Sequence, residues 1–246
     1  MTHDRILGQS QELAERLTQT LHACFPDDSR VIALSLADRV LIQSAPNSAQ
    51  ELRALPRPHQ MPLFVDGKRV AEWTINMHMV LDRSGQFLKT VESALVLKSV
   101  MEKTPLVRLE YRSDMRTAPI SHWQFHAERG AFSHMLAVAH AGGSEYVTDR
   151  PHSLSSLHFP VGGERFRPSI EDFIEFLIRE CGVDKVDGWD QALRENRELW
   201  RRMQLRAAVR DLQAEAAERL RDEGWTVAPP ADFKDVSDES ATLVKW

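Results

Sequence analysis

The sequence predicts an α+β protein, in which an antiparallel sheet of about five to seven strands is flanked by an N-terminal helix and two C-terminal helices. Two patterns carry this prediction. In the first half of the chain, several short segments alternate apolar and polar residues, which is typical of strands with one buried face. Near both ends, apolar residues recur every three or four positions, which is the spacing of an amphipathic helix.

The helices have recognisable beginnings and ends. The first is expected over residues 4–25, where leucines recur at helical spacing. A second begins just after Pro168, because acidic residues there suit a first helical turn, and it ends at Gly182. The last is expected as one long helix over residues 190–223. The chain is therefore divided into an α+β core domain (1–182), a long C-terminal helix (183–225) and an acidic flexible tail (226–246).

The strongest strand signal lies at Ala71–Leu81, where apolar and polar residues alternate with few exceptions. Turn-forming residues follow at Asp82–Gly85, so the chain is expected to return as a hairpin partner. Residues 46–60 contain three prolines and are expected to form a surface loop. The strands of this meander are expected at Val31–Leu36, Arg39–Gln43, Ala71–Leu81, Phe87–Lys98 and Leu106–Arg112.

Residues 121–128 fit two structures. As a strand, they place His122, His126 and Glu128 on one face of the sheet. As a helix, they place the two histidines one turn apart. We favour the strand, because the Trp and Phe between the histidines suit a pleated sheet. A short helix over Ala131–His140 and a short strand over Ser155–Phe159 are expected to follow.

Composition excludes several classes of protein. The chain is 42% hydrophobic and 27% charged, as in an ordinary globular protein. No apolar run approaches the ~20 residues of a membrane helix, and the polar N-terminus lacks signal-peptide features, so we expect a cytoplasmic protein without a membrane partner. The net charge of -5 argues against a surface coated for nonspecific nucleic-acid binding. Cys24 and Cys181 are expected to be small core residues within helices.

The candidate active site is the histidine-rich stretch, since six of the ten histidines lie between His122 and His158 and histidine titrates nearest neutral pH. The strand Leu106–Arg112 is expected to present its charged residues, including Glu110, beside the histidine face. The catalytic candidates are His122, His126, His158 and Glu128. The candidates for binding a substrate phosphate are Arg108, Arg112, Arg165 and Arg167.

Such a set suits cleavage of a phosphodiester. One imidazole would accept the 2′-hydroxyl proton of RNA, another would protonate the leaving oxygen, and arginine would stabilise the developing charge. Neither a metal nor another cofactor is expected, because on a strand His122 and His126 would stand ~13 Å apart, too far to share one zinc ion. A hydrogen-bonded structural cluster is an equally open interpretation of these histidines.

The C-terminal helix suggests a different function. Six arginines lie between Arg194 and Arg210, against two glutamates, and could follow a phosphate backbone. Pairing with acidic residues one turn away, on a helix packed against the core or a second copy, is the more ordinary interpretation. The main alternative function is therefore a non-catalytic interaction module that binds a protein partner, or forms a homo-oligomer, through residues 190–223 and the acidic tail. A small-molecule-binding domain, with the histidine face lining a pocket, is a third.

Four segments in order carry a resemblance to a known group. They are EYRSD at Glu110–Asp114, HWQFHAERG at His122–Gly130, SLHFP at Ser156–Pro160 and a helix opening with SIEDFIEFLI. This order resembles uncharacterised bacterial proteins found beside toxin–antitoxin or phage-defence genes, and is distantly similar to TumE-type toxins. The resemblance implies an RNA-directed toxin or defence component. Together with the histidine chemistry, it makes a metal-independent ribonuclease our leading hypothesis.

The ribonuclease hypothesis makes a direct prediction. His126→Ala and His158→Ala variants are expected to fold normally but to lose RNA cleavage or cellular toxicity, because each removes a proposed proton-transfer group. Cleavage of a labelled RNA by the purified variants measures this. Unchanged activity in both variants contradicts the hypothesis.

Overall fold

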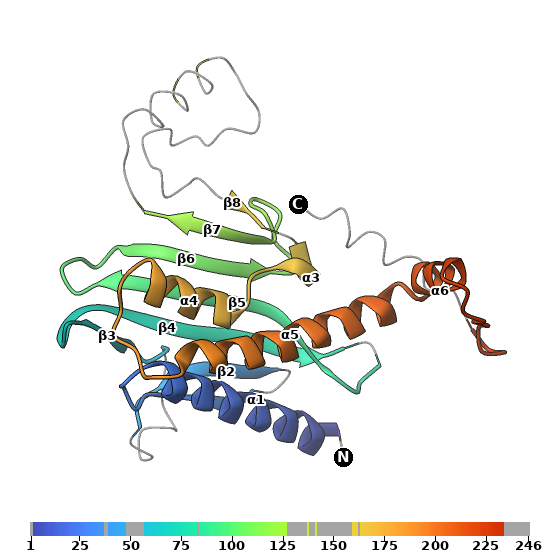
Figure 1. Cartoon of the computed structure of the whole chain (residues 1–246), viewed down its shortest axis with the longest axis horizontal. Helices are drawn as coiled ribbons and strands as arrows, with labels where there is room; N and C mark the ends of the chain where they lie inside the picture. Colours follow the sequence, from blue (N-terminus) through green and yellow to red (C-terminus); the bar gives the residue numbers. More distant parts are fainter. Residues whose placement is uncertain are drawn as a thin grey trace.

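The fold is described from a computed structural model that covers residues 2–36, 39–47, 57–82, 84–126, 137, 141, 159–161 and 163–233 (Figure 1). The helices are α1 (Thr2–Cys24), α3 (Gly163–Phe166), α4 (Ile170–Arg179), α5 (Trp189–Asp211) and α6 (Gln213–Asp222). The strands are β1 (Arg30–Ser35), β2 (Val40–Ala45), β3 (Met61–Val65), β4 (Lys68–Leu81), β5 (Leu88–Ser99), β6 (Pro105–Arg112), β7 (Ser121–Phe125) and β8 (Phe159–Pro160).

The strands form one antiparallel sheet in the order β1-β2-β4-β5-β6-β7-β8, and β3 pairs with β4 beside this path. The predicted α+β class, with an N-terminal helix and C-terminal helices around an antiparallel sheet, is confirmed. The expected hairpin forms between β4 and β5, and its Gly85 adopts a φ of 67°, which glycine reaches without strain. The strand β3 was not expected, since it contains Pro62, which is tolerated in an edge strand but weakens the strand pattern.

The long helices α1, α4 and α5 lie on one face of the sheet (Figure 1). Alternate residues of the strands therefore face the helices, and these are the buried apolar ones, such as Trp73 and Ile75 of β4. Phe173 of α4 stacks between Trp73 and Trp123, with ring centroids 5.7 Å and 5.6 Å away. These rings join α4 to strands that are distant along the chain.

The C-terminal helix differs from the continuous one that the sequence predicts. Leu212 leaves the helical region, with φ -127° and ψ 58°, and the chain continues as the separate helix α6. The residues just before the break are held by the rest of the fold, because Arg210 pairs with Asp82 and Asp211 with Arg165. No residue of α6 is buried, so no packing interaction requires α6 to continue in the direction of α5.

Three smaller expectations have different outcomes. Cys24 is fully buried at the end of α1, as predicted, but Cys181 is exposed just after α4, so the prediction of a core position was wrong there. The short helix expected over residues 131–140 lies almost entirely outside the described residues, as does most of the strand expected over residues 155–159. The acidic tail from residue 234 onward also lies outside them.

The aromatic stack predicts which side chain holds the helices on the sheet. Phe173→Ala is expected to lower the free energy of unfolding by about 3–5 kcal/mol, because it empties a site packed on both sides. Urea denaturation measures the difference. Phe166→Ala is the control, since Phe166 is 74% exposed and its loss should change stability by no more than about 0.5 kcal/mol. Equal losses in the two variants contradict the role given to Phe173.

Candidate functional site

The predicted charged face forms where β6 and β7 pair. Ser121–Phe125 is a strand, as favoured from the sequence, and its register sets His122 opposite Glu110 and Gln124 opposite Arg108. These side chains lie on the face of the sheet opposite the helices, since Leu109 and Trp123, the intervening pair, pack in the core. The sequence therefore located correctly which side chains become neighbours here.

His122 is enclosed rather than presented to solvent. Its side chain is 1% exposed, its Nδ1 lies 2.8 Å from the carbonyl oxygen of Pro119, and its Nε2 lies 3.5 Å from Oε2 of Glu110. The hydrogen bond with His122 and the charge of Arg108 hold the pKa of Glu110 below its usual value, against the effect of burial. In this structure the ring of His122 has no access to a dissolved substrate.

His126 and Arg108 are more accessible members of the same face. Burial lowers the pKa of His126 and the charge of Arg108 lowers it further, while Glu110 acts in the opposite direction. The imidazole is therefore mainly neutral near pH 7. Arg108 lies 3.4 Å from Glu110, and Arg112 lies 3.5 Å from Asp114. Both guanidiniums thus already have a carboxylate neighbour.

Of the remaining predicted residues, Arg165 and Arg167 do not join this face. Glu128 and His158 lie outside the described residues. Arg165 pairs with Asp211, and Arg167 lies over the ring of Tyr111 at 4.4 Å and farther from that of Trp200, at 6.0 Å. Tyr111 belongs to the helix-covered face of β6, so the structure separates these arginines from Arg108 and Arg112 by the thickness of the sheet.

The helix-covered face contains a pocket of about 690 Å³ between the sheet, α1 and α5. Its floor is formed by the sheet residues Met77, Met79, Leu95, Leu109, Tyr111 and Ser121. The sides are formed by Leu13, Arg16 and Leu17 of α1 and by Trp200, Met203, Gln204 and Ala207 of α5. The segment from Arg165 to Glu171 closes it toward α4. None of His122, His126, Arg108 or Arg112 lines it, so the expected pocket on the histidine face stays a prediction.

Three polar groups along this pocket are buried without a hydrogen-bond partner. Within the described part of the chain, these are the hydroxyl of Ser121, Oε2 of Glu171 and Oε1 of Gln204. Ser169 caps α4 through a reciprocal capping box with Asp172, which fixes the first turn and leaves Glu171 facing inward. Glu171 is only 6% exposed. Buried polar groups are normally paired, so these three residues mark where a ligand in the pocket would find hydrogen-bond partners.

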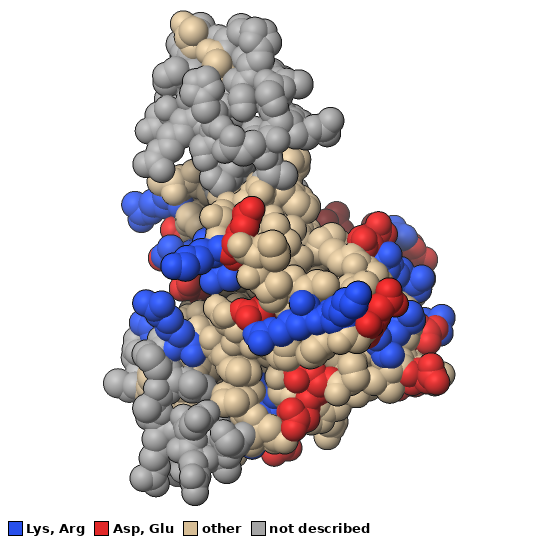
Figure 2. Space-filling model, turned by 90° about the vertical axis from the view of Figure 1, so that its left-hand side faces the viewer, with Lys and Arg blue, Asp and Glu red and all other residues tan. Residues whose placement is uncertain are grey.

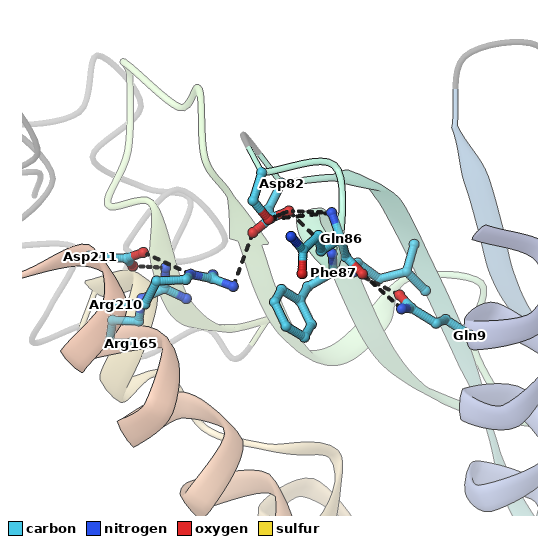
Figure 3. A network of polar contacts seen from close by, with 9 residues as sticks. Gln9, Asp82, Gln86, Phe87, Arg165, Arg210 and Asp211 are labelled. Atoms are coloured by element: carbon cyan, nitrogen blue, oxygen red, sulfur yellow. Dashed lines mark hydrogen bonds and ion pairs between the residues drawn. The ribbon is translucent and has the colours of Figure 1, made fainter. Parts of the chain in front are cut away.

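A polar network lies at one end of the pocket (Figure 3), and its members Gln9, Phe87 and Arg210 also line the pocket. The carboxylate of Asp82 accepts hydrogen bonds from the backbone of Gln86 and Phe87 and lies 3.0 Å from the guanidinium of Arg210. The side chain of Gln9 donates to the carbonyl of Gln86 at 2.8 Å and accepts from the backbone of the next strand. The network thus joins α1 and α5 to the β4–β5 hairpin across the pocket's end.

Charges elsewhere on the described surface are mixed. Four of the six arginines between residues 194 and 210 form ion pairs, with partners on α5, on α4 or on the β4–β5 hairpin. The face in Figure 2 likewise shows basic and acidic side chains interspersed among its described residues. A phosphate backbone is bound best by clustered basic residues, so these surfaces add nothing to the expectation of an RNA partner.

Comparison with protein-family models, curated proteins and solved structures found no match. Among the described residues, no group of three or more His, Cys, Asp or Glu is arranged to hold a metal ion. No helix in the described ranges has the length and apolar character needed to cross a membrane.

The sequence did contain one signal for the pocket. Glu171 lies three residues before Ile174 and seven before Ile178, so on a helix it shares the apolar stripe that packs inward. The acidic residue in the first turn was explained by the helix dipole alone. The presence of a charged side chain on an apolar stripe was therefore overlooked. The rest of the pocket is assembled from residues of several elements, for which no local pattern exists.

The electrostatics of the charged face can be measured directly. The ring of His126 is expected to titrate below 6.5 in an NMR pH series, because burial and Arg108 both disfavour its protonated form. Arg108→Gln should raise this pKa and Glu110→Gln should lower it further. Arg69→Gln, on β4 with its own partner Glu72, serves as the control and should leave it unchanged. A midpoint above 6.5, or a fall on Arg108→Gln, contradicts the described arrangement.

Proposed function

We propose that this chain is a small-molecule-binding domain whose ligand occupies the pocket between the sheet, α1 and α5. The observation that carries the proposal is a pocket of about 690 Å³ with buried, unpaired polar atoms on its lining. Sites for small organic ligands typically enclose about 300–1,000 Å³, with mostly apolar walls and a few polar groups that fix orientation. The walls here follow that composition, with methionine and leucine from the sheet and α1.

The lining also has the features of a binding surface rather than an unfilled core. Arg167 lies over Tyr111, and Trp200 of α5 flanks the same guanidinium, so aromatic and charged groups meet at the pocket. Empty cavities in protein cores are apolar, whereas acceptors beside a cavity need water or a ligand as a partner. A bound ligand satisfies them.

The ribonuclease hypothesis stays a prediction beside this proposal. Two of its four proton-transfer residues, Glu128 and His158, lie outside the described residues, and His122 is buried. The binding proposal depends on none of them.

Filling the pocket tests the proposal. Ala207 lines the pocket from α5, so Ala207→Phe should occupy part of its volume and weaken binding of a neutral environment-sensitive fluorescent dye by at least about tenfold. Val209→Phe is the matched control, because Val209 lies on the same helix but is 56% exposed and does not line the pocket.

The dye titration is read together with thermal melting of both variants. Saturable one-to-one binding that is lost in Ala207→Phe and kept in Val209→Phe supports the proposal. Absence of binding to the unaltered protein, or equal binding to both variants, contradicts it.

A further inference from the structure

The buried carboxylate of Glu171 points to the chemistry of the ligand. Its side chain is 6% exposed, lines the pocket, and has no hydrogen-bond partner for Oε2 among the described residues. A buried charge is normally paired, because an isolated carboxylate loses the favourable hydration that it has in water. Arg197 donates to the backbone carbonyl oxygen of Glu171, and its guanidinium pairs with the carboxylates of Asp172 and Glu175.

The other two unpaired groups can also act as hydrogen-bond acceptors. Oε1 of Gln204 can only accept a hydrogen bond, and the hydroxyl of Ser121 can accept as well as donate. The unpaired groups of the pocket are therefore mainly acceptors, and a ligand that binds them must supply hydrogen-bond donors. A primary ammonium offers three donors and no acceptor, so its pairing capacity fits this lining better than that of a hydroxyl or a carboxylate.

Three of the six basic residues on the pocket's lining, namely Arg165, Arg167 and Arg210, have partners other than Glu171. Arg165 is paired with Asp211, Arg210 with Asp82, and Arg167 lies against Tyr111. The negative charge of Glu171 is felt in the interior, since burial chiefly, and Glu171 secondarily, raise the pKa of Cys24 to about 12. The carboxylate of Glu171 therefore provides a negative charge with which an ammonium group can pair.

Resting on the proposed function, we propose that the ligand is an amphipathic amine, whose ammonium group pairs with Glu171 while its apolar body lies among Leu13, Met77 and Met203. Trp200 and Tyr111 add aromatic surface to the same pocket. The ligand class is an aromatic or aliphatic amine of modest size.

A matched series of competitors tests this inference. Naphthylethylamine, naphthylethanol and naphthylacetic acid share one apolar body and differ in the polar group, and each is titrated at neutral pH against the dye bound to the full chain. The amine should bind at least about tenfold more tightly than the alcohol, because its hydrogen bond is charge-assisted. The acid should bind most weakly.

Variants assign this preference to one carboxylate. Glu171→Gln should reduce the amine to the affinity of the alcohol while changing that of the alcohol less than about twofold. Glu15→Gln is the control, because Glu15 is exposed on α1 and does not line the pocket, and it should leave the preference intact.

The outcomes separate the two proposals. If the dye binds in an Ala207→Phe-sensitive way but the amine has no advantage, or keeps it in Glu171→Gln, the amine inference is wrong and the binding pocket stands. If dye binding is insensitive to Ala207→Phe, the pocket proposal fails and the amine inference fails with it.

Discussion

The stacking of Phe173 between Trp73 and Trp123 is the contact on which the rest of the fold depends. It attaches α4 to the centre and to one side of the sheet, through rings 5.7 Å and 5.6 Å apart, and all three side chains belong to or pack against the core. Because α4 is fixed there, its first turn is brought to the end of the space between α1 and α5. The pocket is thus a consequence of where one helix docks.

The sheet divides the chemistry of the molecule into two separate environments. On the open face, Glu110 lies 3.4 Å from Arg108 and 3.5 Å from His122, and the pKa values of Glu110 and His126 are both lowered. On the covered face, polar groups are buried without such mutual pairing. Unpaired acceptors beside a pocket leave hydrogen-bonding capacity that a bound ligand can use.

Much of the fold could be predicted from the sequence, because strand alternation and turn residues act locally. The alternation in Ala71–Leu81 identified β4, and the alternation in the later strands showed that the charged face of β6 lies beside the histidine face of β7. The pocket could not be predicted, since Leu13 and Ala207 meet across it only after the whole sheet has formed. Arg165 and Arg167 were grouped with the histidines because they lie near His158 in sequence, but the short α3 carries the chain to the covered face.

The buried position of Glu171 needs an explanation that the fold alone does not provide. The N-terminus of α4 favours a negative charge, but such interactions are worth about 0.3–1 kcal/mol, and up to ~2 kcal/mol when partly buried. Burying a carboxylate costs several kcal/mol after relaxation. The capping hydrogen bonds are made by Ser169 and Asp172, so Glu171 contributes nothing to the helix end that Asp172 does not already supply. An apolar residue at this position would pack with Ile174 on the same stripe and stabilise the fold more. A carboxylate kept there at a cost to stability is best explained by a group that enters the pocket and pairs with it.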